Sequence, residues 1–219
     1  MNKVKLTVLV LFISISAMFA QGKMGVGVNG VFAASSGDMK DMFDTGFGGL
    51  ASLNYNVSDN MQLSLTAGYI KFGFNNDYIN DQLKEAGINM SVDVDASLSV
   101  IPIMIGGKYF LSSSDFKPYL AADAGVHIME ITSDKVTVGG QQFDAVGSAS
   151  ETKGAFDIGV GFLMKLSPSI NLDVNGKLNI NGLQIKKEKS FSAGGAYYEE
   201  SSESNAMYFT IAAGLSFAL

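Results

Sequence analysis

The chain has 219 residues, no cysteine and no arginine, and carries a formal net charge of −6 at pH 7. Hydrophobic residues make up 47% of it and charged residues only 16%, below the roughly 25% usual for soluble domains. The apolar content excludes a disordered chain, the acidic balance argues against a nucleic-acid binder, and the lack of cysteine excludes disulfides and thiolate metal sites. A hydrophobic chain with few charges and 25 glycines needs an explanation.

Residues 1–20 have the layout of a secretory signal peptide. Lys3 and Lys5 precede an apolar run over 6–15, and small residues lead to a cut after residue 20. The run is too short for a membrane-spanning helix, which needs about 20 residues, although an uncleaved N-terminal anchor is the alternative. We therefore expect a signal peptide over 1–20 and a single mature unit over 21–219, in which no apolar run is long enough for a transmembrane helix.

Beyond residue 21 the dominant pattern is an alternation of apolar with polar or small residues, which is typical of β-strands. It predicts eight strands, over 24–32, 47–57, 61–69, 92–110, 120–128, 155–165, 170–181 and 207–219. Within 92–110 the apolar residues change from even to odd positions. A β-bulge near Pro102 would reconcile the two phases, because an extra residue reverses the faces of a strand.

The connections between these strands alternate strictly between long and short. The short ones fall at 58–60, 112–115 and 167–169, and the long ones at 34–46, 74–91, 132–153 and 183–205. Bacterial outer-membrane barrels have this asymmetry, with short turns in the periplasm and long loops outside the cell. The sequence therefore predicts an all-β fold, an eight-stranded antiparallel transmembrane β-barrel with short periplasmic turns, long extracellular loops and both termini in the periplasm.

The two faces of the predicted strands differ in side-chain size. One face carries large apolar residues that suit lipid, and the other carries small and polar residues that suit the narrow interior of an eight-stranded barrel. A secreted soluble sandwich is the alternative. Aromatic residues near the strand ends predict girdles at the two membrane interfaces. We expect a polar network inside the barrel from Lys108, Asp123, His127, Asp157, Lys165, Asp173 and Lys177.

One stretch resembles a known family. The segments Ile101–Phe110 and Lys117–Gly125 look like the central hairpin of small outer-membrane β-barrel proteins, the porin-family chains of OmpX- and OmpA-like shape. The resemblance implies a monomer in the outer membrane, among lipids and lipopolysaccharide, inserted by the barrel-assembly machinery. Members usually end in Phe or Trp, whereas this chain ends in Leu219 with Phe217 two residues before it.

The long connections carry further local patterns. Residues 77–86 favour a short helix ended by Gly87, which we expect to lie over the barrel mouth. Gly-Gly pairs at 139–140 and 194–195 predict hairpins that extend strand pairs beyond the membrane. Two roles are open for the lysine cluster of Lys186, Lys187 and Lys189: contact with lipopolysaccharide phosphates, or simple exposure to solvent. No loop has the spaced ligands of a metal site, and no cofactor is expected.

Three classes of function remain open. The first is a structural or surface-interaction protein whose loops contact an extracellular partner. The second is a narrow pore, or a conduit for small solutes or small apolar molecules. The third is a membrane-lipid-modifying enzyme, which would have to use His127, the only histidine. Asp123 is about 13 Å from it along the same strand face, too far to orient the ring, and Asp157 would have to approach from a neighbouring strand. We expect the first class and no enzymatic activity.

Overall fold

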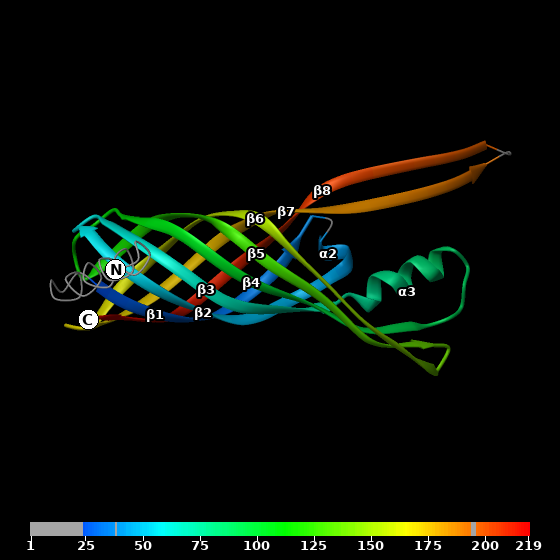
Figure 1. Cartoon of the computed structure of the whole chain (residues 1–219), viewed down its shortest axis with the longest axis horizontal. Helices are drawn as coiled ribbons and strands as arrows, with labels where there is room; N and C mark the ends of the chain where they lie inside the picture. The colour runs from blue at the N-terminus through cyan, green and yellow to red at the C-terminus, as the bar shows by residue number, and fades with distance from the viewer. Residues whose placement is uncertain (1–23, 38, 194–195) are drawn as a thin grey trace, which may run out of the picture.

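A computed structural model describes residues 24–37, 39–193 and 196–219. Eight antiparallel strands pair in chain order, and β1 pairs with β8 to close the ring (Figure 1). The prediction of an eight-stranded antiparallel barrel is therefore confirmed. The strands are β1 (Met24–Ser36), β2 (Phe43–Ser58), β3 (Met61–Phe74), β4 (Val92–Phe110), β5 (Phe116–Val138), β6 (Gln141–Ser167), β7 (Ile170–Ala193) and β8 (Ala196–Ala218).

The two ends of the barrel differ in their connections. At one end, which we call the turn end, short links over 59–60, 111–115 and 168–169 join the strands, and the start of β1 at Met24 and the C-terminus lie there (Figure 1). At the opposite end, the loop end, β1 leads through helix α2 (Met39–Met42) to β2, and β3 leads through helix α3 (Asn76–Glu85) to β4. Within the described residues, no helix is long and apolar enough to span a bilayer.

The connection predicted as a long loop over 132–153 is mostly β-structure. Strands β5 and β6 stay paired out to Val138 and Gln141, which Gly139 and Gly140 join in a two-residue turn. Both glycines have positive φ angles, 58° and 84°, as a type I′ hairpin turn requires. The hairpin predicted at this Gly-Gly pair is confirmed. Strands β7 and β8 also extend outward as a pair, while Gly194 and Gly195 lie outside the described residues.

The β-bulge predicted near Pro102 is wrong. Ala67 lies opposite Ile103 and Ile70 opposite Val100, so the register of β3 and β4 is the same on both sides of the proline. The register with β5 is also continuous there, and the irregularity in that pairing lies at Asp95/Ala96. Even-numbered residues of β4 from 98 onward therefore face the interior, where Leu98, Val100 and Met104 are buried.

The outward face of the strands is rich in exposed apolar side chains, as predicted. Phe32, Phe47 and Phe156 face outward towards the loop end, and Phe32 and Phe47 meet edge to face at 5.3 Å between ring centroids. Tyr109 is exposed near the turn end. Such bands of aromatic residues are typical of the two interfaces of a membrane barrel.

Helix α3 forms where it was predicted, but its expected place over the mouth is wrong. The amides of Asn76 and Asn80, one helical turn apart, each donate to and accept from the backbone of β4, Asn76 at Val94 and Asn80 at Val92. These bonds satisfy an edge of β4 that extends beyond β3, and so hold α3 against the outward extension of β4, past the loop end (Figure 1).

Candidate functional site

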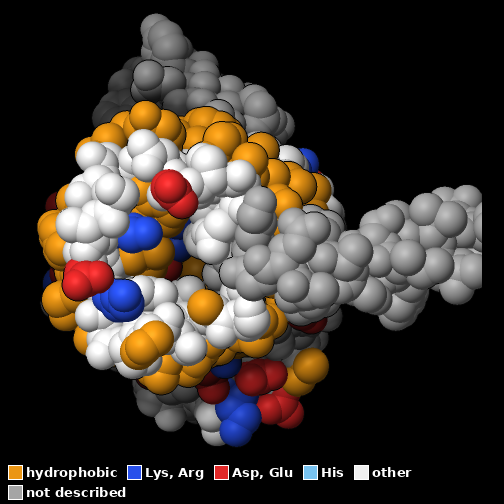
Figure 2. Space-filling view, turned by 90° about the vertical axis from the view of Figure 1, so that its left-hand side faces the viewer, with side chains coloured by type: hydrophobic (Ala, Val, Ile, Leu, Met, Phe, Trp, Pro, Cys, Tyr) orange, Lys and Arg blue, Asp and Glu red, His pale blue; other side chains and the backbone are white. Residues whose placement is uncertain are grey.

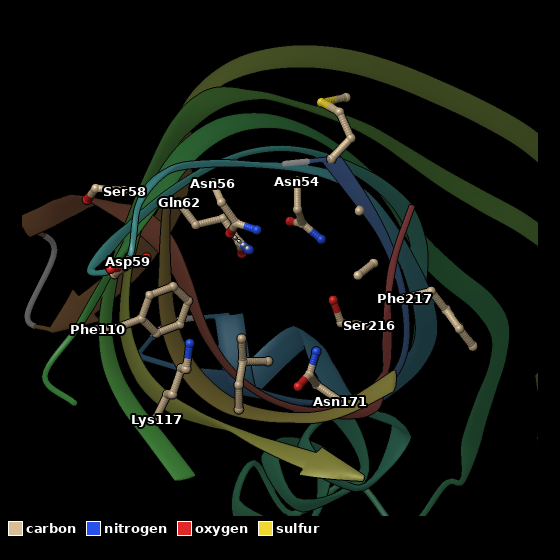
Figure 3. A pocket seen from close by; sticks show the side chains of 14 residues that line it. Asn54, Asn56, Ser58, Asp59, Gln62, Phe110, Lys117, Asn171, Ser216 and Phe217 are labelled. Carbon is tan, nitrogen blue, oxygen red and sulfur yellow. Dashed lines mark hydrogen bonds between the residues drawn. The ribbon is translucent and has the colours of Figure 1, made fainter. Parts of the chain in front are cut away.

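The interior of the barrel has three zones, and the first is a vestibule at the turn end. It is a pocket of about 180 Å³, seen as the central hollow of the end face in Figure 2. Carboxamides, a hydroxyl and one lysine point into it from five strands (Figure 3): Asn54, Asn56, Gln62, Lys117, Asn171 and Ser216. A polar pocket of this size has room for several water molecules.

Ion pairs cross the interior above the vestibule and form the second zone, which we call the ionic layer. Lys108 of β4 reaches Asp173 of β7, with Nζ 2.5 Å from Oδ2, and the Tyr119 hydroxyl donates to the other oxygen of Asp173 at 2.5 Å. Lys177 of β7 reaches Asp123 of β5 at 2.6 Å. Both aspartates are only 4% exposed, so these bonds form away from water and close the barrel cross-section.

Inward-facing glycines make room for the ionic layer. A Cβ at Gly106 would lie 2.0 Å from Asp123 Oδ1, one at Gly159 would lie 2.6 Å from Lys177 Cγ, and one at Gly161 would lie 2.6 Å from the Tyr119 hydroxyl. An eight-stranded barrel leaves little space inside, so large polar side chains fit only where their neighbours have none. Part of the glycine content thus follows from the interior ion pairs.

The remaining residues of the predicted polar network are not part of these two ion pairs. Asp157 of β6 is 5% exposed, and its Oδ1 has no hydrogen-bond donor among the described residues. His127 is fully buried, with Nδ1 3.4 Å from the Tyr208 hydroxyl and Nε2 without a partner in the described structure. Lys165 lies near the turn end, where its half-exposed ammonium is 3.6 Å from Asp115. It is therefore outside the ionic layer.

An apolar layer fills the loop end of the interior, and the sequence analysis missed it. Its side chains, each at most 5% exposed, come from six strands and α2: Val31, Ala33, Met39, Phe43, Ile70, Phe72, Leu98, Val100, Met129, Ala206, Tyr208 and Ala212. Phe72 packs edge to face on Tyr208 at 5.3 Å between ring centroids. Met39 of α2 and Phe43, both at most 3% exposed, belong to the same layer, so α2 lies where α3 was expected.

The expectation that the interior face is small and polar is therefore wrong for the loop end, and it holds only in part for the turn end, where Phe110 and Leu163 are buried beside the vestibule. Alternation alone does not reveal this layer, because both faces of β4 are apolar between Leu98 and Ile105. One signal was available in the sequence. If no bulge is assumed, Ile101, Ile103 and Ile105 face lipid, and Leu98 and Val100 must then face inward.

The comparisons with known proteins agree with this geometry. A family model described as outer membrane protein beta-barrel domain matches residues 6–217. The chain belongs to the outer membrane β-barrel family. The outward apolar face of this barrel is therefore its lipid-facing surface in a bacterial outer membrane.

Two solved structures share the barrel fold. Neisserial surface protein A is 15% identical, with a TM-score of 0.55, and the match covers 90% of this chain and 97% of that one. A major outer membrane protein of Thermus thermophilus is 9% identical, with a TM-score of 0.55, and the match covers 90% and 99% of the two chains. At these identities the likeness concerns the fold alone. Among curated proteins, none matches this chain in sequence.

His127 is hydrogen-bonded to neither of the two carboxylates considered as its partners. Those carboxylates are Asp123 and Asp157. Lys177 binds Asp123, and Asp157 lies opposite Asp123 in the ladder of β5 and β6. In the part of the chain that the structure describes, no group of three or more His, Asp or Glu side chains is arranged to hold a metal ion. The side chains of Lys186, Lys187 and Lys189, considered for lipopolysaccharide phosphates, lie outside the described residues.

Proposed function

We propose that this outer membrane β-barrel is a structural and surface-interaction protein, not a pore and not an enzyme. The observation that carries the proposal is the closed interior. The ionic layer spans the barrel from β4 to β7, and the apolar layer lies between it and the loop end. A water-filled passage needs polar walls along its whole length, whereas twelve closely packed apolar residues offer none.

The part of the barrel beyond the membrane supports a contact role. Residues 141–154 of β6 pair with β5 on one side, and no strand among the described residues pairs with their other edge. Phe143 and Val146 on this segment are 54% and 83% exposed. Exposed strand edges and apolar side chains outside the lipid are features of protein contact surfaces. We infer an extracellular protein or a neighbouring cell surface as the partner.

The proposal includes an orientation and a route to the membrane. The turn end and both termini face the periplasm, because short turns lie there in barrels of this kind. Residues 1–20 act as a signal peptide, residues 21–219 form the mature barrel, and the barrel-assembly machinery inserts it as a monomer among lipids and lipopolysaccharide. The orientation is tested by adding protease to intact cells, which should cut the loop end and leave the turn end uncut.

Electrical conductance separates the proposed function from the pore alternative. The refolded barrel in a planar lipid bilayer is expected to carry no steady current above the bilayer baseline, since the ionic and apolar layers block the interior. The folded state is checked by the mobility difference between unheated and boiled samples on a gel, and an open porin serves as the positive control. A steady single-channel current from protein shown to be folded would establish a pore and refute the proposal.

A further inference from the structure

Next to the two ion pairs of the ionic layer lies a third buried carboxylate, Asp157, for which no ammonium group is left. Lys108 pairs with Asp173, and Lys177 pairs with Asp123. Asp157 is buried, with only 5% of it exposed, and it has no ion-pair partner among the described residues. A buried ionised carboxylate without a cation is strongly unfavourable, so this third group needs a compensating charge.

Asp157 also lies beside another carboxylate. In the antiparallel ladder of β5 and β6 it is directly opposite Asp123, and both side chains face the interior. Residues opposite each other in such a ladder have Cβ atoms about 4.5–5.5 Å apart. Two carboxylates this close, with a single ammonium group available to both, do not both ionise readily.

The surrounding groups do not supply the missing positive charge. The charged and titratable side chains that face the middle of the interior around Asp157 are Lys108 of β4, Tyr119, Asp123 and His127 of β5, Asp173 and Lys177 of β7, and Tyr208 of β8. Both lysines are already paired. His127 lies four residues beyond Asp123 along β5, about 13 Å away, and its Nε2 has no acceptor, which an imidazolium would need.

A metal cation is also disfavoured next to Asp157. The cavity that Asp157 lines measures about 20 Å³, which is room for one water molecule. Lys177 lines the same cavity, so its ammonium group would repel a second cation there. A proton is the remaining way to neutralise the extra carboxylate.

We propose that Asp123 and Asp157 form a carboxyl pair that holds one proton between them and shares Lys177 as its single cation. Lys177 is bonded to Asp123 in the structure, so the proton resides on Asp157. If Asp123 is neutralised, Asp157 takes over the ammonium group and gives up the proton. The pair is thus a proton-binding site sealed inside the barrel, and it is independent of the proposed surface role.

Side-chain isosteres test this sharing. Asp157→Asn and Asp123→Asn should each change the folded-to-unfolded ratio less than about tenfold, because each leaves one carboxylate for Lys177. The double substitution leaves Lys177 without a carboxylate and should lower the ratio more than roughly a hundredfold. Asp173→Asn, which deprives Lys108 of its carboxylate, is the matched control and should behave like the double substitution. If Asp157→Asn alone costs as much as Asp173→Asn, the proposal is wrong.

Infrared spectroscopy of the wild-type barrel tests the proton directly and needs no variant to fold. At pH 7 exposed carboxyl groups are ionised, so the C=O stretch of a protonated carboxylic acid should report the pair alone. We expect this band in the wild-type protein, unchanged when sodium is replaced by a bulky organic cation. The band should be absent from Asp157→Asn. Its absence from the wild type, or a requirement for sodium in barrel stability, would overturn the proposal.

Discussion

Replacing Asp173 with alanine is expected to lower the free energy of unfolding by about 3–5 kcal/mol. The substitution leaves the ammonium group of Lys108 buried without its partner and removes the acceptor of the Tyr119 hydroxyl. An isolated buried charge is far more costly than a lost surface contact, which makes this the largest single-residue effect we expect. Equilibrium unfolding in urea, with the barrel refolded in lipid or detergent, measures it.

The matched control for Asp173→Ala is Lys165→Ala. Lys165 also forms an ion pair with an aspartate, Asp115, but its side chain is 49% exposed and that of Asp115 is 84% exposed. Exposed pairs contribute up to about 1 kcal/mol, so Lys165→Ala should stay within that range. Equal losses for the two variants would show that the ionic layer does not stabilise the barrel.

The second large effect is expected at Gly106. An alanine Cβ there would lie 2.0 Å from Asp123 Oδ1 and 2.5 Å from the Ala122 carbonyl oxygen, so either the backbone or the Lys177–Asp123 pair must move. Overpacking of this kind costs about 1–3 kcal/mol, and disruption of the ion pair adds to it. The same urea titration measures the change.

Gly107→Ala is the control on the adjacent residue. Gly107 belongs to the same strand but to the outward face, and the nearest atom to a Cβ there is the Gln62 carbonyl oxygen at 3.4 Å. We expect its free energy of unfolding to stay within about 0.5 kcal/mol of the wild type. If Gly107→Ala proved as damaging as Gly106→Ala, the loss would reflect glycine in the strand itself, and not the space it leaves for the ion pairs.

The barrel architecture was predictable because a period of two is a local property of each strand. The eight segments, their antiparallel order and the Gly139-Gly140 hairpin all follow from residues close together in the sequence. The inward positions of Lys108, Asp123, Asp157, Asp173 and Lys177 were predictable for the same reason.

The pairing of those charges was not predictable. Lys108 and Asp173 are 65 residues apart, and they meet only because the barrel closes with a particular stagger between strands. Lys165 shares the inward alternation of β6, but it lies so near the turn end that it pairs with Asp115. The position of α3 could not be predicted from the sequence either, because it depends on hydrogen bonds from two asparagine amides to a free edge of β4.

The layering of the interior can be tested directly, since the chain has no cysteine of its own. Ser216 and Ala212 both face inward on β8, but Ser216 lines the vestibule and Ala212 belongs to the apolar layer. Single substitutions Ser216→Cys and Ala212→Cys are treated with a water-soluble thiol reagent in the folded barrel. We predict rapid modification at position 216 and none at position 212. Comparable modification at both positions would mean that water passes the apolar layer, which contradicts a closed interior.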